Sequence, residues 1–589
     1  MRSIVPLPVL LRVRLPLDHV QGAHEGHKSA SGSMATSASN PAPKDVDREF
    51  ILLTAILDEN KADFFRENQA KMTSFGGNAA IGASFTAAMA ERLKYKQLKD
   101  GWYKESNKMH AINGKVFCGL DGLTFADTDK TRVHLMSLGD EHSHVPVFEG
   151  QTFLDHGHRT AAPGLMSASM RTIDVAARGG GKYAQPGTWL LHDGVTDHLR
   201  HGQKAAFTVT GTTAADLAQG SGATYHIAAD EVEWDYAPSG RDLCADASHA
   251  KVVLDTRAAQ RDAGFEPDTL HQGHHRIGHA YIKARYRQYT SSAWSKLRFG
   301  QKSRFNAISE HLGLQGPLMQ GSEGDVLTVH FKNKLRFPCN FHVGGGVISR
   351  GAHDPTDAVP PGGERTYLLE LTSASAPATG SPNEKSTIAY PYFSSLDHAV
   401  HKRNTGAGAA ARTTAAAVAN FAGVDAGLFG VLLVKRRGAA AFPGSEIATV
   451  FATLDENRSP YLDMNIAKYA GSGASVDKSD PVFKESNRMH SINGRSYCNL
   501  RGLDLLKNKQ TRWYQLVLGS TNDVHAPLIY GQAQDVWGHH VAATEVFPGQ
   551  GVVGDFRPRY PGAWLMQSST ISHAQNGMQA MLNVADRIA

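Results

Sequence analysis

The stretch GTWLLHDGVTDHLRHGQ, from Gly187 to Gln203, gathers residue types that bind metal ions. Its residues His192, Asp193 and His198 lie close together along the chain. Imidazole nitrogen and carboxylate oxygen suit zinc, iron and copper(II), whereas thiolate sulfur is the soft ligand that copper electron-transfer sites require. The stretch therefore predicts a metal-binding strand and loop, and its lack of a cysteine raises the question of whether a redox metal can work there.

The remaining composition excludes several other classes of protein. The four cysteines are far apart and form no CxxC pair, which excludes a zinc ribbon, a thioredoxin-type site and a dense disulfide scaffold. The 589 residues carry 61 basic and 56 acidic side chains, a net charge of +5, and show no basic stripe with interleaved aromatic residues. We therefore expect no nucleic-acid partner. No apolar run reaches the length of about 18 residues that a transmembrane helix needs, so none is expected.

An internal repeat indicates how the chain is organised. The segment KESNKMHAING at 104–114 returns as KESNRMHSING at 484–494. The same two regions share three further pairs in the same order: LDEN at 57–60 and 454–457, TRVHLMSLG at 131–139 with TRWYQLVLG at 511–519, and GTWLL at 187–191 with GAWLM at 562–566. Two homologous domains are therefore predicted at 46–212 and 446–586.

A third domain is predicted between the repeats, at 222–438. In GDVLTVHFKN the residues Leu327, Val329 and Phe331 share one face, the period of a half-buried strand. Many short strands between glycine and proline turns favour an all-β fold of sandwiches over a parallel α/β sheet. Residues 1–45 are rich in Ser, Ala and Pro, and we expect a disordered segment or a poor signal peptide there.

Several segments together resemble the ceruloplasmin, hephaestin and coagulation factor V/VIII group of multicopper oxidases. They are YHIAADEVEWDYAPSGRD (225–242), EHLGLQGPLMQGSEGDVLTVHFKN (310–333), GLFGVLLVKRRG (427–438), LDENRSPYLDMNI (454–466), KESNRMHSING and GTWLLHDGVTDH. The resemblance implies three tandem cupredoxin (plastocyanin-like) Greek-key β-sandwiches of even, odd and even type. It also implies copper as cofactor, Fe(II) as substrate and an extracellular or secretory location. Such families often have six domains, which leaves a shortened relative and an incomplete gene product as alternatives.

The resemblance also implies which residues of the first domain would hold a blue copper. His144 and His198 stand at the histidine positions, Asp193 at the cysteine position and Gln203 at the axial methionine position. Without a thiolate there is no blue-copper electronic structure and no covalent route for the electron. We expect either a site where His144, Asp193 and His198 hold a single Fe(II), Zn(II) or Cu(II) ion, or an inherited frame without metal.

The last domain departs from the family pattern differently. It keeps His525, His573 and Met578, but Ser568 stands where the cysteine belongs. A serine hydroxyl stays protonated near neutral pH and is a poor ligand for a soft metal. The alternatives are a weak copper site and a polar pocket at the end of the sandwich.

The family's three-copper cluster uses eight histidines in four pairs. The corresponding positions here are Val147 with Glu149, His192 with Gly194, His342 with Gly344, and Phe393 with Ser395. Only His192 and His342 are histidines, so no oxygen-reducing cluster is expected in this chain alone. The alternative is that both are core or interface histidines bonded to the backbone.

Two functions follow from these patterns. The first is a ferroxidase-type multicopper oxidase that oxidises Fe(II) with dioxygen, with its missing parts supplied by another cupredoxin chain or by further domains. The second is a non-catalytic cupredoxin scaffold that binds a partner or a single metal ion. Fold alone does not decide between them, so the sites must.

Overall fold

In the computed structural model, twelve ranges of the chain are described: 45–64, 107–138, 142–175, 186–211, 222–244, 276–298, 310–350, 358–379, 383–395, 422–470, 476–519 and 524–586. The expectation of a disordered segment or signal peptide at 1–45 falls almost wholly outside them. No helix in these ranges is long and apolar enough to cross a bilayer.

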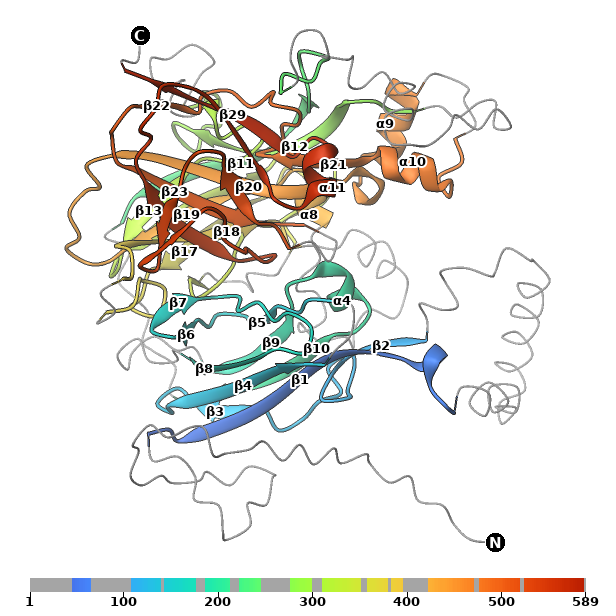
Figure 1. The fold of residues 1–589 in the computed structure, drawn as a ribbon. Coiled ribbons are helices and arrows are strands. Elements are labelled where there is room, and N and C mark those ends of the chain that lie inside the picture. Colours follow the sequence, from blue (N-terminus) through green and yellow to red (C-terminus); the bar gives the residue numbers. More distant parts are fainter. Residues whose placement is uncertain are drawn as a thin grey trace, which may run out of the picture.

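The first β-sandwich packs a six-stranded sheet, in the order β2-β1-β4-β8-β6-β7, against a four-stranded sheet, β3-β10-β9-β5 (Figure 1). Its core is apolar and includes Phe125, Val133, Leu135 and Phe207. The strands are β1 (Arg48–Asp58), β2 (Lys108–Ile112), β3 (Thr124–Ala126), β4 (Thr131–Ser137), β5 (Pro146–Phe148), β6 (Phe153–Asp155), β7 (His158–Thr160), β8 (Met170–Val175), β9 (Gly187–Asp193) and β10 (Lys204–Thr210).

The second sandwich packs the sheet β12-β11-β14-β17-β16 against β13-β19-β18-β15. The alternation predicted for β14 is confirmed, because Leu327, Val329 and Phe331 are fully buried in its core. The strands are β11 (Thr224–Asp235), β12 (Ala280–Tyr289), β13 (Met319–Ser322), β14 (Val326–Asn333), β15 (His342–Val343), β16 (Ile348–Arg350), β17 (Glu364–Glu370), β18 (Thr387–Phe393) and β19 (Phe429–Lys435).

The third sandwich repeats the strand order of the first, with the sheets β21-β20-β23-β27-β25-β26 and β22-β29-β28-β24. The repeated segments thus form the same structure twice, and the predicted all-β fold of three tandem cupredoxin-type sandwiches is confirmed. The domain boundaries stay a prediction. The strands are β20 (Ser445–Asp455), β21 (Arg488–Ile492), β22 (Asp504–Leu506), β23 (Thr511–Val517), β24 (Pro527–Ile529), β25 (Gln534–Val536), β26 (His539–Val541), β27 (Gly551–Phe556), β28 (Gly562–Ser568) and β29 (Gln579–Ala585).

The helices of the described ranges are short and lie in the connections between strands. Two of them lie between the last two strands of a sandwich, α4 between β9 and β10 and α11 between β28 and β29, and each carries a histidine, His198 in α4 and His573 in α11. The helices are η2 (Glu59–Lys61), α4 (Thr196–Arg200), α8 (Ala422–Asp425), η6 (Glu456–Arg458), α9 (Leu462–Tyr469), α10 (Pro481–Ser486) and α11 (Ile571–Gln575).

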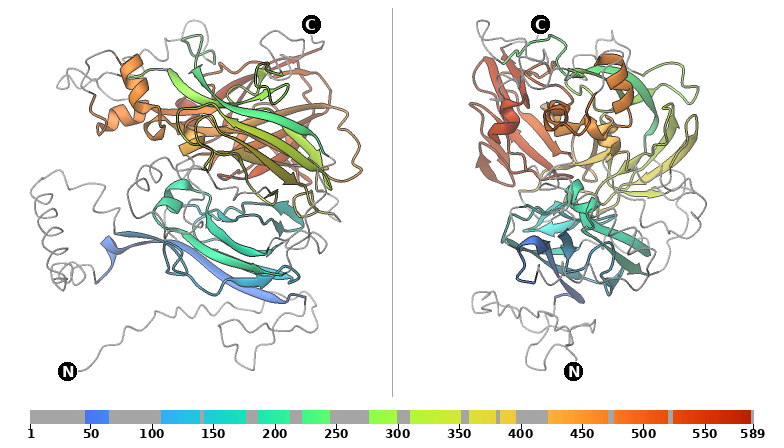
Figure 2. Two further views of the ribbon diagram at one scale, coloured as in Figure 1. Left: turned by 180° about the vertical axis from the view of Figure 1, so that it is seen from behind. Right: turned by 90° about the vertical axis from the view of Figure 1, so that its right-hand side faces the viewer.

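The second and third sandwiches lie side by side and share one apolar core, to which Trp234 and Leu314 contribute from one side and Ala448 and Leu518 from the other (Figure 2). A fully buried ion pair joins them between Lys283 and Glu456. The hydroxyl of Tyr236 also donates to Glu456, at 2.6 Å.

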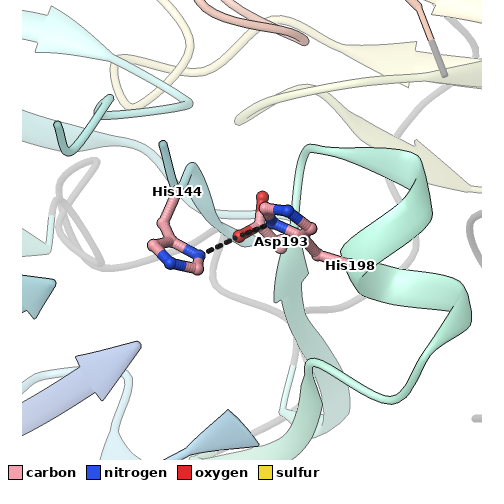
Figure 3. A group of neighbouring side chains, drawn as sticks. All are labelled: His144, Asp193 and His198. Atoms are coloured by element: carbon pink, nitrogen blue, oxygen red, sulfur yellow. Dashed lines mark hydrogen bonds and ion pairs between the residues drawn. The ribbon is translucent and has the colours of Figure 1, made fainter. Parts of the chain in front are cut away.

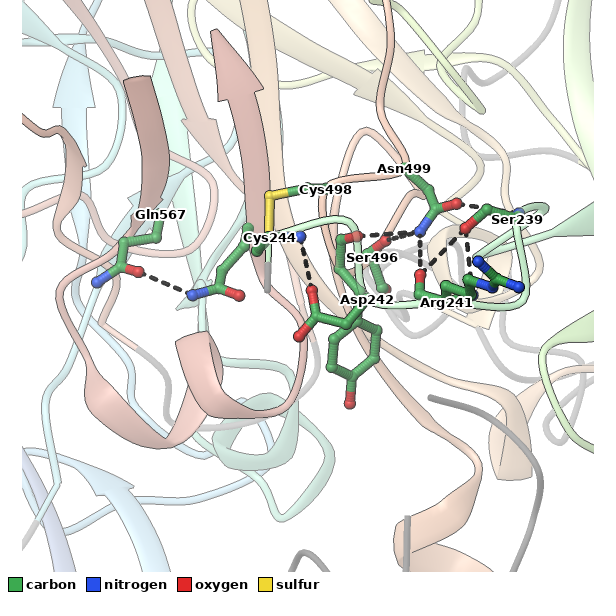
Figure 4. The surroundings of a disulfide bond; sticks show 10 residues. Ser239, Arg241, Asp242, Cys244, Ser496, Cys498, Asn499 and Gln567 are labelled. Carbon is green, nitrogen blue, oxygen red and sulfur yellow. Dashed lines mark hydrogen bonds between the residues drawn. A yellow bond between two sulfur atoms is a disulfide. The ribbon is translucent and has the colours of Figure 1, made fainter. Parts of the chain in front are cut away.

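A disulfide between Cys244 and Cys498 also joins the second and third sandwiches (Figure 4). Around it, the backbone amide of Leu243 donates to the carbonyl of Tyr497 at 3.1 Å, and the amide of Ser239 donates to the Asn499 side chain, also at 3.1 Å. This pairing was not predicted, because cysteine connectivity cannot be deduced from spacing alone.

The first sandwich meets the other two through the side that carries β5 and α4, while β1 and β4 lie on its far side (Figure 1). Arg458 of η6 lies between Asp197 of α4, at 3.2 Å, and Asp425 of α8, at 3.4 Å. One guanidinium group therefore contacts an acidic residue in each of the two neighbouring sandwiches.

Candidate metal centres

The first cluster lies at one end of the first sandwich, where three connections meet (Figure 3). His144 precedes β5 and pairs with Leu165 in an isolated bridge, Asp193 ends β9, and His198 lies in α4. The side chains of all three are at most 1% exposed. The structure thus brings together the three residues that were predicted to form one site.

Asp193 is the centre of this cluster. Its Oδ2 atom lies 3.0 Å from Nδ1 of His144 and 3.1 Å from Nδ1 of His198. Its Oδ1 atom accepts the backbone amides of Val145, at 3.1 Å, and Val195, at 2.8 Å. Because one carboxylate oxygen is held by the backbone, the other is fixed in position between the two imidazole rings.

The charge state of Asp193 follows from these contacts. Burial opposes ionisation of this carboxyl group, but His198 and His144 outweigh burial and hold its pKa well below the ordinary value. The residue is therefore an ionised carboxylate near neutral pH. Within the described ranges, Nε2 of His198 has no hydrogen-bond partner.

These three side chains can serve as ligands to one ion. Their ligand atoms all lie within 4.8 Å of one another. Two imidazole nitrogens and one carboxylate oxygen suit Zn(II), Fe(II) or Cu(II) with open positions, and they do not suit a blue copper, which needs a thiolate. Gln203, at the axial position, places Oε1 3.2 Å from Nδ1 of His144 and donates to the carbonyl of Ala111.

The third sandwich holds a second histidine cluster at the equivalent end. Nδ1 of His525 lies 3.0 Å from Nδ1 of His573, and Oγ of Ser568 lies 3.4 Å from the same His525 atom. Met578 is fully buried in the adjacent core. Two nitrogens at this separation suit one ion bound at about 2.0–2.1 Å from each. The two predicted histidine ligands of this domain therefore lie together, beside a serine in place of a thiolate, and the backbone amide of Met578 donates to the carbonyl of His573 at 2.9 Å.

His192 and His342 join neither cluster and lie on either side of Glu149. Nε2 of His192 is 2.9 Å from Oε1 of Glu149, and Nε2 of His342 is 3.3 Å from Oε2. Nδ1 of His192 lies 2.8 Å from the carbonyl of Asp193, the backbone bond expected of an interface histidine. Burial opposes ionisation of Glu149, but His342 and His192 lower its pKa below the ordinary range. Burial likewise opposes protonation of His192, but Glu149 raises its pKa.

The fit of a three-copper cluster to this interface can be judged from the side chains. The ring of Phe393 lies against His342, with centroids 5.3 Å apart, and Glu149 stands at another of the histidine positions. Copper sites of this kind need imidazole donors, and one carboxylate with two imidazoles cannot coordinate three ions. The residues present do not fit a three-copper cluster.

Sequence reasoning missed the histidines that surround both clusters. His110 of β2 lies beside His198, with ring centroids 5.3 Å apart, and His490 of β21 lies beside His573 at 5.2 Å. Both belong to the repeated motif that ends in ING, which served above only to identify the repeat. The signal was available, since this histidine occupies the same position in both repeats.

No protein-family model matches the sequence. Comparison with curated proteins instead relates the chain to the multicopper oxidases of the ceruloplasmin and hephaestin group, as the motifs implied. The human ferroxidase HEPHL1 is 28% identical over 566 residues, which cover 92% of this chain and 43% of that protein. Human ceruloplasmin is 30% identical over 557 residues, which cover 93% of this chain and 46% of that protein.

The chain thus spans less than half the length of the curated relatives it matches. Among solved structures, a crystal structure of a multicopper oxidase matches at a TM-score of 0.35 and 13% identity, covering 62% of this chain and 88% of that one.

Proposed function

We propose that this chain is a ferroxidase-type multicopper oxidase relative that binds a single divalent transition-metal ion in its first sandwich and does not by itself reduce dioxygen. The observation that carries the proposal is the buried cluster of His144, Asp193 and His198. An ionised carboxylate between two imidazoles is a donor set for Zn(II), Fe(II) or Cu(II).

The arrangement of charges favours a bound cation. Asp193 Oδ2 lies close to two imidazole nitrogens, while its other oxygen accepts two backbone amides. A nearby positive charge stabilises a buried carboxylate. A divalent ion supplies that charge, and it is bound by neutral imidazoles.

Neither histidine cluster contains the cysteine thiolate that a blue copper site of an oxidase uses. Asp193 and Ser568 occupy the positions where the resemblance implies cysteines, and neither side chain gives the copper–thiolate bond that carries the electron in blue sites. His525, His573 and Met578 could hold copper, but without that bond. This supports metal binding without rapid electron transfer.

The second candidate is a ferroxidase that works together with another cupredoxin chain. It is favoured by the relationship to a protein named ferroxidase over 92% of this chain. In this reading Fe(II) is the substrate, copper is the cofactor, and the missing histidines and thiolates come from the other chain.

Metal analysis, visible spectroscopy and oxygen uptake on Fe(II) separate the two candidates. The proposal expects about one divalent ion per chain, no intense blue absorption and no oxygen consumption by the copper-loaded chain. Several copper ions per chain with blue absorption and oxygen uptake would overturn it. Uptake only after a second cupredoxin chain is added would favour the second candidate.

An extracellular or secretory location is also proposed. It is supported by the Cys244–Cys498 disulfide, since disulfides persist in oxidising compartments and are rare in the cytosol. Detection of that disulfide in protein alkylated at the moment of cell lysis is the test, and finding two reduced thiols would count against this location.

A further inference from the structure

The first and third sandwiches are repeats, but only the third packs its outer sheet face against the second sandwich. On that face Ala448, Leu454 and Leu518 are completely buried in the shared core. Their counterparts in the first sandwich follow from the strand registers. Ala448 of β20 pairs with Tyr514 of β23, and Ile51 of β1 pairs with His134 of β4, so Ile51 corresponds to Ala448. The counterparts Ile51, Leu57 and Leu138 are 45%, 38% and 37% exposed. The same face is therefore covered in one repeat and open to solvent in the other.

The polar residues that hold the second sandwich recur in the first sandwich. In the third sandwich, Glu456 pairs with Lys283, Asn487 accepts from the hydroxyl of Tyr281 at 3.0 Å, and the carbonyl of Gly494 accepts from Nε1 of Trp234 at 2.6 Å. The guanidinium group of Arg495 lies 3.9 Å from the centre of the Trp234 ring. The counterparts in the first sandwich are Glu59, Asn107, Gly114 and Lys115.

These counterparts already have the local structure that the equivalent residues of the third sandwich have in their contact with the second sandwich. The side-chain amide of Asn107 donates to Oδ1 of Asn60 at 2.9 Å. The side-chain amide of Asn487 donates to Oδ1 of Asn457 in the same way, at 3.0 Å. Gly114 and Lys115 are exposed, whereas Gly494 is buried. The turn and its side chains thus keep their form where the second sandwich does not contact them.

The cysteines follow the same pattern. Cys498 forms the disulfide with Cys244 of the second sandwich, and its counterpart Cys118 is a half-buried free thiol. The two residues share a left-handed backbone conformation, with φ values of 58° and 62°. The neighbouring Phe117 is 60% exposed. A thiol, an apolar face and a set of polar partners therefore coincide on one surface.

We propose that this surface, made of β1, β2, β4 and the turn 113–118, binds an odd-type cupredoxin domain carried by another polypeptide. The partner domain presents a lysine, a tyrosine, a tryptophan and a cysteine at the positions that Lys283, Tyr281, Trp234 and Cys244 occupy here. The free Cys118 thiol and the partner's free thiol lose two electrons and two protons to an oxidant of the thiol–disulfide exchange class, and a disulfide forms.

The occupant follows from which surfaces are already used. The matching surface of this chain's own second sandwich is covered by the third sandwich, and a second copy of the chain presents the same covered surface. Human HEPHL1 and human ceruloplasmin are each matched over less than half of their own length, so more than half of each protein lies outside the region that corresponds to this chain. The proposal specifies the contact surface for the second candidate function, but it depends on neither metal site.

A tandem chain tests the proposal. In it, a duplicate of residues 222–445 is fused in front of residue 49, so that the duplicate is joined to the first sandwich in the same way as the second sandwich is joined to the third. We expect peptide mapping without reductant to find a new disulfide between Cys118 and the duplicate Cys244. We also expect alkylation of Cys118 by iodoacetamide to be at least tenfold slower than in the parent chain. The matched control carries Glu59→Lys, which faces the duplicate lysine with a like charge and should restore alkylation.

Three results would overturn the proposal. In the first, Cys118 of the tandem chain reacts as fast as in the parent chain. In the second, Cys339 of the duplicate becomes reactive, which would mean that the duplicate domain does not fold beside the first sandwich. Cys339 is buried in the parent fold, where the same domain lies beside the third sandwich. In the third, the parent chain alone dimerises through Cys118 in sedimentation velocity runs, which would assign the surface to a second copy of this chain.

Discussion

Asp193 decides what the first histidine cluster can bind. A thiolate at this position would favour copper in a redox role, whereas a carboxylate favours harder divalent ions and gives no sulfur bond for the electron. Since both of its oxygens already have partners in the folded protein, the side chain is fixed before any ion arrives. The residue is thus a preorganised anionic ligand.

Replacing Asp193 with asparagine tests this role. Asparagine keeps the shape of the side chain but removes the negative charge, so we expect the affinity for Zn(II) at pH 7 to fall at least tenfold. Titration calorimetry measures the change. His201→Gln is the matched control, since this exposed histidine lies next to His110 and outside the cluster, and it should leave the affinity unchanged. Equal affinities for wild type and Asp193→Asn would rule out the site.

A substitution in the third sandwich tests the other cluster. Ser568→Cys completes a set of two histidines, one cysteine and one methionine, the ligands of blue copper. We expect this variant to develop intense visible absorption on addition of Cu(II), and Ser568→Ala to remain colourless. If both variants stay colourless with Cu(II) bound, the interpretation of His525, His573 and Met578 as a ligand frame is wrong.

At this scale the sequence predicted the residues that meet, but not all of their partners. His144, Asp193 and His198 follow from the family's spacing, because the ends of paired strands fix the loops that carry them. The resemblance assigned Glu149, His192 and His342 to one interface, but it did not predict that the carboxylate of Glu149 contacts both histidines, which come from different sandwiches. Contacts across an interface leave no periodic signal in either strand.

At the scale of elements, the repeat was the strongest predictor. Equivalent strands such as β4 and β23 occupy the same place in the same sheet order, so a pattern shared by two regions of the sequence predicted shared topology. The covering of β20 and the exposure of β1 could not be predicted, because both strands carry similar apolar residues. What differs is the neighbour, which lies far away in the sequence.

The Cys244–Cys498 disulfide gives a prediction about these elements. Its removal in Cys498→Ser should lower the free energy of unfolding by about 2–5 kcal/mol, because a cross-link across a long loop restricts the unfolded chain. Urea denaturation of oxidised protein measures the loss. The matched control is Cys118→Ser, the same change at the same position of the other repeat, where a free thiol should cost under about 0.5 kcal/mol. If the two variants lose similar free energies of unfolding, the disulfide stabilises the protein no more than a free thiol does.

At the scale of the whole molecule, the three sandwiches meet around Arg458, Asp197 and Asp425. Burial raises the pKa of Asp425 to about 7, and Arg458 only partly opposes this effect. The ordinary value is 3.8, so between about pH 4 and pH 7 the folded protein holds a proton that the unfolded chain releases. The stability from this group is complete below pH 4 and is lost as the pH rises through 7.

Asp425→Asn should remove this pH dependence, because an amide does not titrate. Between pH 5.5 and pH 8 we expect the free energy of unfolding of the wild type to fall by about 2 kcal/mol more than that of the variant. Urea denaturation at both pH values measures the difference. The control is Asp463→Asn, whose carboxylate is 79% exposed, and it should follow the wild type. Parallel pH profiles for wild type and Asp425→Asn would contradict the prediction.

The disulfide between the second and third sandwiches also affects how damage to the backbone would be seen. Cys244 and Cys498 are 254 residues apart in sequence, so one protease cut anywhere between them leaves both pieces attached. Such a nicked molecule would migrate as intact on a non-reducing gel and separate into two fragments only after a reducing agent is added.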